Sequence, residues 1–331
     1  MAAELRAGLV GLGSMGRHHA RVLRELPGVE LVGAVDPTGD PYGVAGDLPV
    51  YREVAELVAA GVDMAVVAAP TVTHEPVGLE LAAAGVHTMV EKPIAADVAG
   101  AQRLVDAFEA AGLVGAVGHI ERFNPALQAL RARVLSGELG DVYQIVTRRQ
   151  GPFPQRIADV GVVKDLATHD IDLTAWIAGS PYITVAAQVA ARSGREHEDL
   201  VAATGRLANG TVVNHLVNWL SPMKERLTMV TGERGAFVAD TIGVDLTYYA
   251  NGTFATEWDS VANFRGVTEG DVTRFALAKR EPLRLEHEAF RDAVLGVRDE
   301  VVSLREGLAT LRVAESLLEA SGTGRAVTLP A

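Results

Sequence analysis

The sequence predicts an α/β domain with a doubly wound parallel sheet, followed by an α+β domain with a mostly antiparallel open sheet. Three observations lead to this fold class. A glycine-rich turn lies between a strand and a helix near the start, and short apolar strands alternate with helices through the first third. Hairpin-forming strands then dominate the second half of the chain.

The glycine-rich turn has the spacing of a dinucleotide-binding element. Gly11, Gly13 and Gly16 form G-x-G-x-x-G between an apolar run that ends at Val10 and a predicted helix over 15–26. The first glycine permits a tight turn, the second lets a pyrophosphate approach the backbone, and the third lets the helix pack against the strand. The spacing alone is weak evidence, because a glycine turn without a ligand is an alternative in a chain with 34 glycines.

Asp36 supplies the missing context. It ends a second apolar run over 29–35 and follows Gly16 by 20 residues, where an acid accepts both ribose hydroxyls of adenosine. The same carboxylate repels a 2′-phosphate. The sequence therefore predicts NAD as the cofactor.

Length, charge and composition exclude several classes of function. The 331 residues suit two domains, and the net charge of −12 argues against a nucleic-acid or anionic-membrane partner. The chain has no cysteine, which excludes disulfides, thiolate metal sites and a cysteine nucleophile. The start lacks the features of a signal peptide, and no apolar run approaches the roughly 18 residues of a membrane span, so we expect a cytoplasmic protein.

The first third repeats a strand and helix rhythm. Further strands are predicted over 63–69, 86–90 and 113–118, and further helices over 52–60, 76–84 and 97–111. Continuously apolar strands joined by helices indicate a parallel sheet. We place an NAD-binding Rossmann domain over 1–119 and a substrate-binding and oligomerisation domain over 120–331, whose C-terminal helices can pack back on the first domain.

Beyond residue 120 the pattern changes. Helices are predicted over 125–136 and 164–177, with a strand over 142–149 between them, and the following strands are predicted over 184–191, 200–207, 211–220, 225–231, 236–240, 245–250 and 253–258. Asn209-Gly210 and Asn251-Gly252 are two-residue turns that close hairpins. Helices over 285–295 and 304–321 complete the chain, the second with a capping box of Ser303 and Glu306.

Two constellations bear on chemistry. Lys92 follows the strand over 86–90, which puts it at the carboxyl end of a parallel sheet, where ligands bind in open α/β folds. Pro93 ends the strand and holds the lysine there. A second group is spaced by four, three and four and so lies on one helix face: Asp165, His169, Asp172 and Trp176. From the pattern alone, a solvated helix face is an equally good interpretation.

Together these residues resemble the successive signatures of the glucose–fructose oxidoreductase, inositol dehydrogenase and MocA family, over essentially the whole chain. The matching segments are 11–16, Asp36, Ala69-Pro70-Thr71 with His74, Glu91-Lys92-Pro93 and 161–170. The resemblance implies that Lys92, Asp165 and His169 line the substrate beside the nicotinamide. It also implies these cofactor contacts: Gly11, Gly13, Ser14, Met15, Gly16, Asp36, Pro70, Thr71, His74, Glu91 and Lys92.

Finer similarity lies in segments 117–125 and 159–172. They resemble the branch of the family that includes UDP-N-acetylglucosamine 3-dehydrogenases, NAD-dependent enzymes that oxidise the 3-hydroxyl of a nucleotide sugar. Lys164 departs from this branch, because it stands where an aliphatic residue is expected. The resemblance therefore predicts oxidation at C3 of a UDP-N-acetylhexosamine, with the exact sugar or its anionic substituent left open.

The chemistry also follows from the residue types. Oxidising a secondary alcohol requires a base near neutral pKa and a donor for the developing alkoxide. Histidine has the intrinsic pKa of such a base, which favours His169, whereas Lys92 can stabilise the alkoxide as a cation or act as the base itself. Asp165 would orient His169 or bind a neighbouring sugar hydroxyl. The sequence leaves open which of Lys92 and His169 takes the proton.

A basic cluster near the start of the second domain offers a diphosphate or carboxylate site. Arg148 and Arg149 end a predicted strand, with Arg156 and Lys164 nearby, and because adjacent strand residues face opposite sides only one of the two arginines reaches a cleft. Ordinary surface salt bridges are the alternative. The residues predicted to contact substrate are His119, Arg122, Asn124, Arg149, Lys164, Asp165 and His169.

No metal site is predicted. His287-Glu288 begins like a zinc protease element, but Arg291 occupies the place of the second histidine. The acidic segment 196–199 is interpreted as a solvated turn. His18 and His19 lie on the first helix, where at most one faces the cofactor.

Three classes of function compete. The first is an NAD-dependent dehydrogenase of a sugar or nucleotide sugar, and the second is a related NAD(P)-dependent reductase or dehydrogenase of another sugar, an inositol or an imine in natural-product metabolism. A redox-inactive NAD-binding sensor is the third, disfavoured because it has no need of Lys92, Asp165 and His169. We also expect a homodimer or homotetramer built sheet against sheet, to cover apolar strand residues such as Val212, Leu216 and Trp219.

Overall fold

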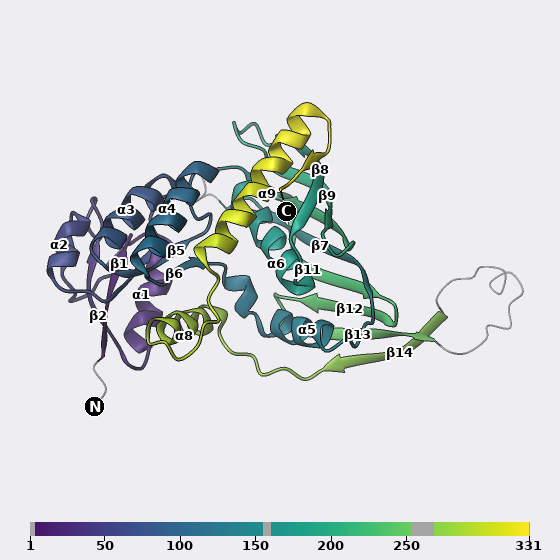
Figure 1. Ribbon diagram of the computed structural model, residues 1–331, viewed down its shortest axis with the longest axis horizontal. Helices are drawn as coiled ribbons and strands as arrows, with labels where there is room; N and C mark the ends of the chain where they lie inside the picture. Colours follow the sequence, from purple (N-terminus) through teal and green to yellow (C-terminus); the bar gives the residue numbers. More distant parts are fainter. Residues whose placement is uncertain (1–3, 155–159, 253–267, 331) are drawn as a thin grey trace, which may run out of the picture. The chain divides into compact units, whose positions relative to one another are not determined.

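The computed structural model describes residues 4–154, 160–252 and 268–330, which form two compact units (Figure 1). The first unit comprises Met1–Phe123, Gln155–Val160 and Arg280–Glu315. The second comprises Asn124–Pro154, Gly161–Lys279 and Ser316–Ala331. The first unit thus runs past residue 119 and includes a segment near the C-terminus.

The first unit is built on the predicted parallel sheet, with strand order β3-β2-β1-β4-β5-β6. Its strands are β1 (Leu5–Val10), β2 (Val29–Val35), β3 (Val50–Tyr51), β4 (Met64–Val67), β5 (His87–Glu91) and β6 (Gly115–Gly118). Its helices are α1 (Gly16–Glu25), α2 (Val54–Ala59), α3 (Thr71–Ala83), α4 (Val98–Ala111), the short η1 (Ile120–Phe123), α8 (Pro282–Val294) and the first part of α9 (Leu304–Thr323).

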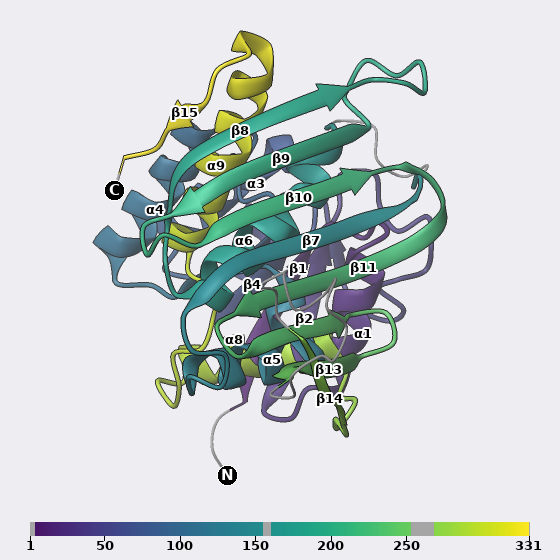
Figure 2. The ribbon, with the colours of Figure 1, turned by 90° about the vertical axis from the view of Figure 1, so that its right-hand side faces the viewer.

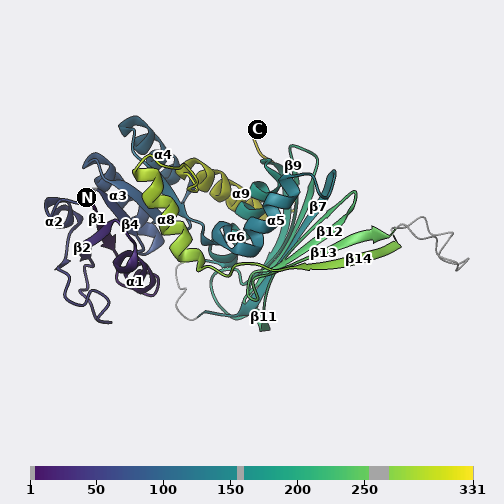
Figure 3. The ribbon, with the colours of Figure 1, turned by 90° about the horizontal axis from the view of Figure 1, so that it is seen from below.

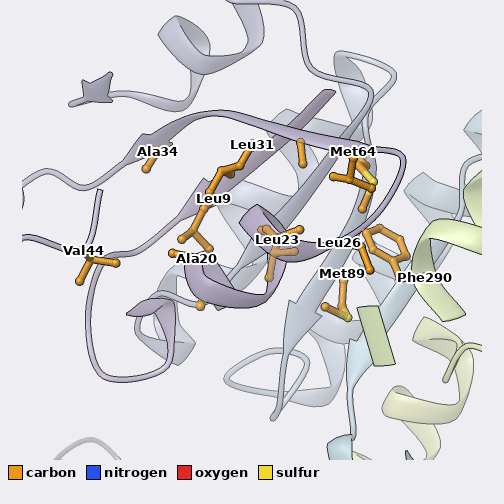
Figure 4. Packing of buried hydrophobic residues seen from close by; sticks show 14 of the residues in the cluster. Leu9, Ala20, Leu23, Leu26, Leu31, Ala34, Val44, Met64, Met89 and Phe290 are labelled. Carbon is orange, nitrogen blue, oxygen red and sulfur yellow. The ribbon is translucent and has the colours of Figure 1, made fainter. Parts of the chain in front are cut away.

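Alternation along the strands builds a core on each side of this sheet. Leu9 and Met89 pack with residues of α1 and with Phe290 of α8 (Figure 4). Their strand neighbours Val10 and Val90 face the other way and pack with residues of α2 and α3. Because successive strand residues point to opposite faces, continuous apolar runs are what a sheet covered on both faces requires.

Helix boundaries follow local capping chemistry. Asp97 accepts a hydrogen bond from Gly100 N at 2.7 Å and caps α4, and Ser303 and Glu306 form the predicted capping box at α9. The predicted start of α3 near residue 76 is wrong. The helix begins at Thr71, and Pro76 lies inside it rather than opening it.

The second unit contains a nine-stranded sheet of order β14-β13-β12-β11-β7-β10-β9-β8-β15. The strands are β7 (Val142–Pro152), β8 (Tyr182–Ala190), β9 (Leu200–Leu207), β10 (Val212–Asn218), β11 (Leu220–Gly232), β12 (Gly235–Asp240), β13 (Asp245–Gly252), β14 (Thr268–Phe275) and β15 (Val327–Thr328). Only β7 and β10 pair in parallel among these described strands, so the predicted mostly antiparallel sheet is confirmed.

One predicted turn of this sheet is wrong. Asn251 and Gly252 do not close a tight hairpin, because they continue β13 and pair with Glu269 and Thr268 of β14. The strand predicted over 253–258 lies outside the described residues. The sequence analysis missed β14, whose residues Thr-Glu-Gly-Asp-Val-Thr-Arg-Phe carry few apolar side chains.

One face of the second sheet is covered by α5 (Pro125–Leu135) and α6 (Thr168–Ala178), which lie behind it in Figure 2 and beside it in Figure 3. On the other face, strand register places Val146, Met229 and Val238 side by side. Leu216 is 49% exposed and Met229 37%. Trp219 does not belong to this face, because it is 4% exposed and packs against Phe153.

The helices in the described part of the chain were compared with the length and composition of a membrane span. None of the helices in this part of the chain combines the length and the apolar character needed to cross a bilayer.

Candidate active site

The turn after β1 has the geometry that close approach of a pyrophosphate requires. Gly11 has φ of +97°, and a Cβ there would lie 2.5 Å from the Ala68 carbonyl oxygen. A Cβ on Gly16 would lie 2.0 Å from the Gly11 oxygen, so α1 can begin close to the strand only with glycine. A Cβ on Gly13 would meet nothing within 4 Å, so this face of the turn is open. The turn therefore fits a dinucleotide at the start of α1.

Asp36 is fixed beside this turn by three hydrogen bonds. Its Oδ2 accepts from Leu12 N at 3.0 Å, and its Oδ1 accepts from Thr38 N at 2.9 Å and from Thr38 Oγ1 at 2.7 Å. Burial alone raises the pKa of Asp36, but the hydrogen bonds from Thr38 and Leu12 outweigh it and hold the pKa below its usual value. The carboxylate of Asp36 is therefore ionised at neutral pH, and it lies beside the glycine turn.

Four more of the predicted cofactor contacts lie after the ends of two strands, β1 and β4: Ser14, Met15, Pro70 and Thr71. Ser14 is exposed in the glycine turn, and Met15 directly precedes α1. Pro70 directly precedes α3, and Thr71 is its first residue. Their role toward a ligand stays a prediction.

His74 supports the ends of two neighbouring strands. Its ring is 1% exposed, with Nε2 lying 2.9 Å from the Ala69 oxygen and Nδ1 lying 2.9 Å from the Pro93 oxygen. It thereby connects the loop after β4 to the turn that carries Lys92. The structure gives His74 a direct role in shaping this edge of the sheet.

Lys92 follows the last residue of β5, at the carboxyl edge where the sequence places it. Its backbone N–H donates to Glu91 Oε2 at 3.1 Å. Glu91 is 8% exposed, and its Oε1 lies 2.9 Å from His19 Nε2. The predicted cofactor contact Glu91 is thus engaged by two groups of its own unit.

The segment with Asp165 and His169 is not one regular α-helix. A π-helical turn, η2 (Val163–Ala167), precedes α6, so Asp165 belongs to the π turn and His169 to the first turn of α6. Single π turns occur frequently at functional sites. The solvated-face interpretation is wrong, because Asp165 and Asp172 are 5% and 1% exposed. Lys164 is half-buried in η2.

Two acidic residues of a hairpin connection bind backbone N–H groups, one of them at the start of η2. Glu198 Oε1 accepts from Val163 N at 3.0 Å. Asp199, 1% exposed, accepts from the backbone N–H groups of Arg192 and Ser193. The interpretation of this segment as a solvated turn is therefore wrong for Glu198 and Asp199, which bind backbone instead.

Arg148 and Arg149 face opposite sides of the sheet, as predicted. Arg149 is 3% exposed, and its Nε donates to Asp170 Oδ1 at 2.7 Å. Arg148 is exposed and pairs with Glu225. The buried pair therefore binds β7 to α6 one residue after His169, and Arg156 lies outside the described residues.

A buried polar network that the sequence analysis missed also holds α6 on the sheet. His215 Nδ1 lies 2.7 Å from Thr147 Oγ1, and its Nε2 lies 2.8 Å from the hydroxyl of Tyr182. That hydroxyl contacts Thr174 of α6 at 2.5 Å. Burial lowers the pKa of His215 to about 4, so the ring is neutral and each nitrogen has one defined role. Polar residues at inward-facing strand positions were the available signal.

The other predicted substrate contacts divide between the units. His119 is 2% exposed and belongs to the first unit, as does Arg122, whose guanidinium lies 2.7 Å from Glu306 Oε1. Asn124 belongs to the second unit, where Oδ1 caps α5 and Nδ2 donates to the Thr241 oxygen at 3.1 Å. Within residues 4–154, 160–252 and 268–330 we find no cluster of side chains suited to a metal ion.

Comparison with known proteins supplies the family context. Residues 5–119 match the model of an oxidoreductase family with an NAD-binding Rossmann fold. Residues 127–238 match the GFO/IDH/MocA C-terminal domain. The two matches cover most of both units.

Several relatives are dehydrogenases. The chain is 30% identical over 319 residues to UDP-N-acetylglucosamine 3-dehydrogenase from Acidithiobacillus ferrooxidans, covering 96% of each chain. It is 32% identical over 266 residues to the myo-inositol dehydrogenase Hyg17 from Streptomyces leeuwenhoekii, covering 75% of this chain and 82% of that one.

Solved structures agree with these matches. The UDP-N-acetylglucosamine 3-dehydrogenase GnnA of Acidithiobacillus ferrooxidans superposes with a TM-score of 0.82 at 28% identity, covering 97% of this chain and 98% of that one. GenD2 from gentamicin A biosynthesis, solved in complex with NAD, gives a TM-score of 0.81 at 26% identity and covers 100% of this chain and 98% of that one.

Proposed function

The chain belongs to the GFO/IDH/MocA family of NAD-dependent dehydrogenases that act on CH–OH groups, and from this premise we propose that it oxidises C3 of a UDP-N-acetylhexosamine. The main support for this choice of substrate is the similarity, over 96% of the chain, to a UDP-N-acetylglucosamine 3-dehydrogenase. The inositol dehydrogenase Hyg17 matches over 75%. An inositol or another sugar is therefore the second candidate.

We assign the cofactor to the glycine turn and Asp36. The open face at Gly13 leaves room for the diphosphate, and ionised Asp36 accepts hydrogen bonds from the adenosine ribose. NAD, when bound, supplies the nicotinamide that accepts a hydride from the substrate carbon.

The chain itself handles the proton and the developing charge. We assign Lys92 and His169 to the reacting hydroxyl: one takes its proton, and the other donates to the alkoxide as the carbon is oxidised. Asp165 orients His169 or binds a neighbouring hydroxyl of the sugar. The Arg149–Asp170 pair and the His215 network support α6, which carries His169. The remaining predicted substrate contacts are His119, Arg122, Asn124, Arg149 and Lys164.

Turnover of a substrate panel tests the assignment. We expect the protein to reduce NAD in the presence of UDP-N-acetylglucosamine or UDP-N-acetylgalactosamine, measured by absorbance of the reduced cofactor. The same assay with free sugars and inositols should give much lower kcat/KM. Efficient turnover of an inositol with none of a UDP-sugar would favour the second candidate instead.

Asp36→Ala should change cofactor selectivity. Because the carboxylate accepts from the ribose and repels a 2′-phosphate, the parent protein should bind NAD more tightly than NADP, and the variant should narrow this gap. Titration of intrinsic fluorescence with each cofactor gives the two dissociation constants. Equal constants for NAD and NADP in the parent protein would contradict the assignment of Asp36.

We also propose a homodimer or homotetramer in which the open face of the second unit's sheet is covered by another copy. The aligned Val146, Met229 and Val238, with half-exposed Leu216, support this. Light scattering at micromolar concentration should give a multiple of the chain mass of 34.9 kDa. Leu216→Lys should shift the protein toward monomer, and a parent protein that is already monomeric rejects the proposal.

A further inference from the structure

Four titratable side chains lie buried together in the first unit beside the Lys92 turn, and only one of them, Glu91, is a predicted cofactor contact. They are His19 of α1, Glu91 of β5, and Glu286 and His287 of α8, with exposed fractions of 0%, 8%, 2% and 0%. Removing ionisable groups from water is costly unless they are paired and hydrogen-bonded. We therefore expect the four side chains to be held by contacts with one another or with the backbone.

Hydrogen bonds arrange three of the four in a chain that ends at Lys92. Glu91 Oε2 accepts from Lys92 N at 3.1 Å, and Glu91 Oε1 lies 2.9 Å from His19 Nε2. His19 Nδ1 in turn lies 2.9 Å from His287 Nε2. Gly118 of β6 leaves room for the carboxylate, since a Cβ there would lie 3.1 Å from Glu91 Cδ. One carboxylate thus connects the lysine turn to α1, the helix that follows the glycine turn.

The charges in this chain have a defined distribution. Burial raises the pKa of Glu91, but the hydrogen bond and charge of His19 and the charge of Lys92 outweigh it and lower the pKa, so this carboxylate is ionised. Burial and repulsion by Glu91 raise the pKa of Glu286 well above its usual value, which favours the neutral form of this acid. Burial lowers the pKa of His287, which is neutral as well.

The direction of the hydrogen bond between His19 and Glu91 is then defined. Ionised Glu91 can only accept, so His19 Nε2 carries a proton and donates to it. In the next contact, His19 Nδ1 and His287 Nε2 share one hydrogen. The single negative charge of the chain is thereby held at Glu91, against the backbone of Lys92.

We propose that Glu91 is a positioning residue for Lys92, and that His19 and His287 hold the Glu91 carboxylate in its place. This inference rests on the proposed function, because it takes Lys92 to act on the reacting hydroxyl. Glu91 fixes the amide of Lys92 through this hydrogen bond, and the charge of Lys92 in turn favours the ionised form of Glu91. Through His19 the same carboxylate joins the lysine turn to α1, the helix that follows the glycine turn. Lys92 and the predicted cofactor site therefore keep one relative position within this unit.

Two substitutions at one position test the chain. In His19→Gln the side-chain amide nitrogen reaches the place of Nε2 and can still donate to Glu91, whereas in His19→Asn it reaches only the place of Nδ1. We expect Glu91→Gln and His19→Asn to lower kcat about 10- to 100-fold, and His19→Gln to lower it less than about threefold. The Kd for NAD should change little in the two His19 variants.

A kinetic isotope effect separates positioning from mere support of the fold. With substrate deuterated at the reacting carbon, the isotope effect on kcat should grow in Glu91→Gln and His19→Asn, because a misplaced lysine slows the hydride step itself. Glu286→Gln is the control for packing. It replaces a buried acid outside the hydrogen-bonded chain with an amide of the same shape, so kcat and the isotope effect should equal those of the parent.

Two results would overturn the positioning role. One is that Glu91→Gln and His19→Asn lower the Tm while kcat, KM and the isotope effect stay at parent values. The other is that His19→Gln and His19→Asn lose kcat equally. A Lys92→Ala enzyme distinguishes these results from failure of the proposed function: near-normal kcat in Lys92→Ala contradicts the function itself, whereas a slow Lys92→Ala with a fully active Glu91→Gln contradicts only the positioning role.

Discussion

Lys92→Ala is expected to lower kcat by about 10²-fold or more while the Kd for NAD changes little. The reason is that a group acting on the reacting hydroxyl stabilises the transition state much more than it stabilises bound cofactor. His169→Ala should behave in the same way. Steady-state kinetics with a UDP-N-acetylhexosamine, together with fluorescence titration of NAD, separate the two quantities.

Asp165→Asn is the milder companion of these variants. The replacement is nearly isosteric and should keep the fold, but it removes the charge that orients His169 or accepts from a sugar hydroxyl. We expect a lower kcat with an unchanged Tm. Near-normal kcat in both Lys92→Ala and His169→Ala would mean that the chemistry does not take place at this edge of the sheet.

Arg149→Met is expected to give the largest loss of stability, about 3–5 kcal/mol in the free energy of unfolding. The substitution keeps much of the side-chain volume but leaves Asp170, 1% exposed, without its guanidinium partner. Urea unfolding followed by circular dichroism measures the change. Because the pair binds β7 to α6, the same variant should also displace His169 of α6 and lower the activity.

The neighbouring arginine provides a matched control. Arg148 pairs with Glu225 on the other side of the same strand, and its side chain is 46% exposed. Because Glu225 keeps a second hydrogen bond from Gln150, Arg148→Met should cost about 0–1 kcal/mol. The double variant Arg149→Met with Asp170→Leu should recover much of the stability, since no charge is then buried alone. Equal losses for Arg148→Met and Arg149→Met would contradict the structural role of the buried pair.

Local rules accounted for the elements that sequence could predict. The strand over 29–35 has the same bounds in the structure, because its apolar residues have to be covered on both faces of a parallel sheet. Gly11 and Gly16 of the first turn each meet a steric demand of the fold, whereas Gly13 leaves the face of the turn open, and the spacing of the three glycines predicts all three positions. Capping residues such as Ser303 also act within a few positions of the chain.

The misses have a common physical origin in contacts between distant segments. The π turn at η2 depends on Glu198, 35 residues away from Val163, so no helical spacing could reveal it. In β14 the pairing with β13 overrides a polar sequence. His287 was considered only as the start of an incomplete zinc motif, and its contact with His19 joins residues 268 positions apart.

The candidate site residues likewise fall into those that local sequence patterns predict and those that depend on contacts between distant segments. Sequence and family resemblance placed Lys92 at a strand end and Asp36 beside the glycine turn, because the βαβ pattern fixes those positions. The contacts of His19 with Glu91 and of His74 with Pro93 flank Lys92 in sequence, and these two histidines come from other elements and carry no short motif of their own. A motif therefore locates the candidate residue, and the fold is needed to find the side chains around it.

Transfer of deuterium from C3 tests the central claim most directly. UDP-N-acetylglucosamine deuterated at C3 is incubated with the protein and NAD, and the reduced cofactor is analysed by mass spectrometry. The proposed function predicts that the reduced cofactor carries one deuterium and that the sugar becomes a 3-keto product. Reduced cofactor without deuterium, or none at all from this sugar while an inositol is oxidised, would contradict it.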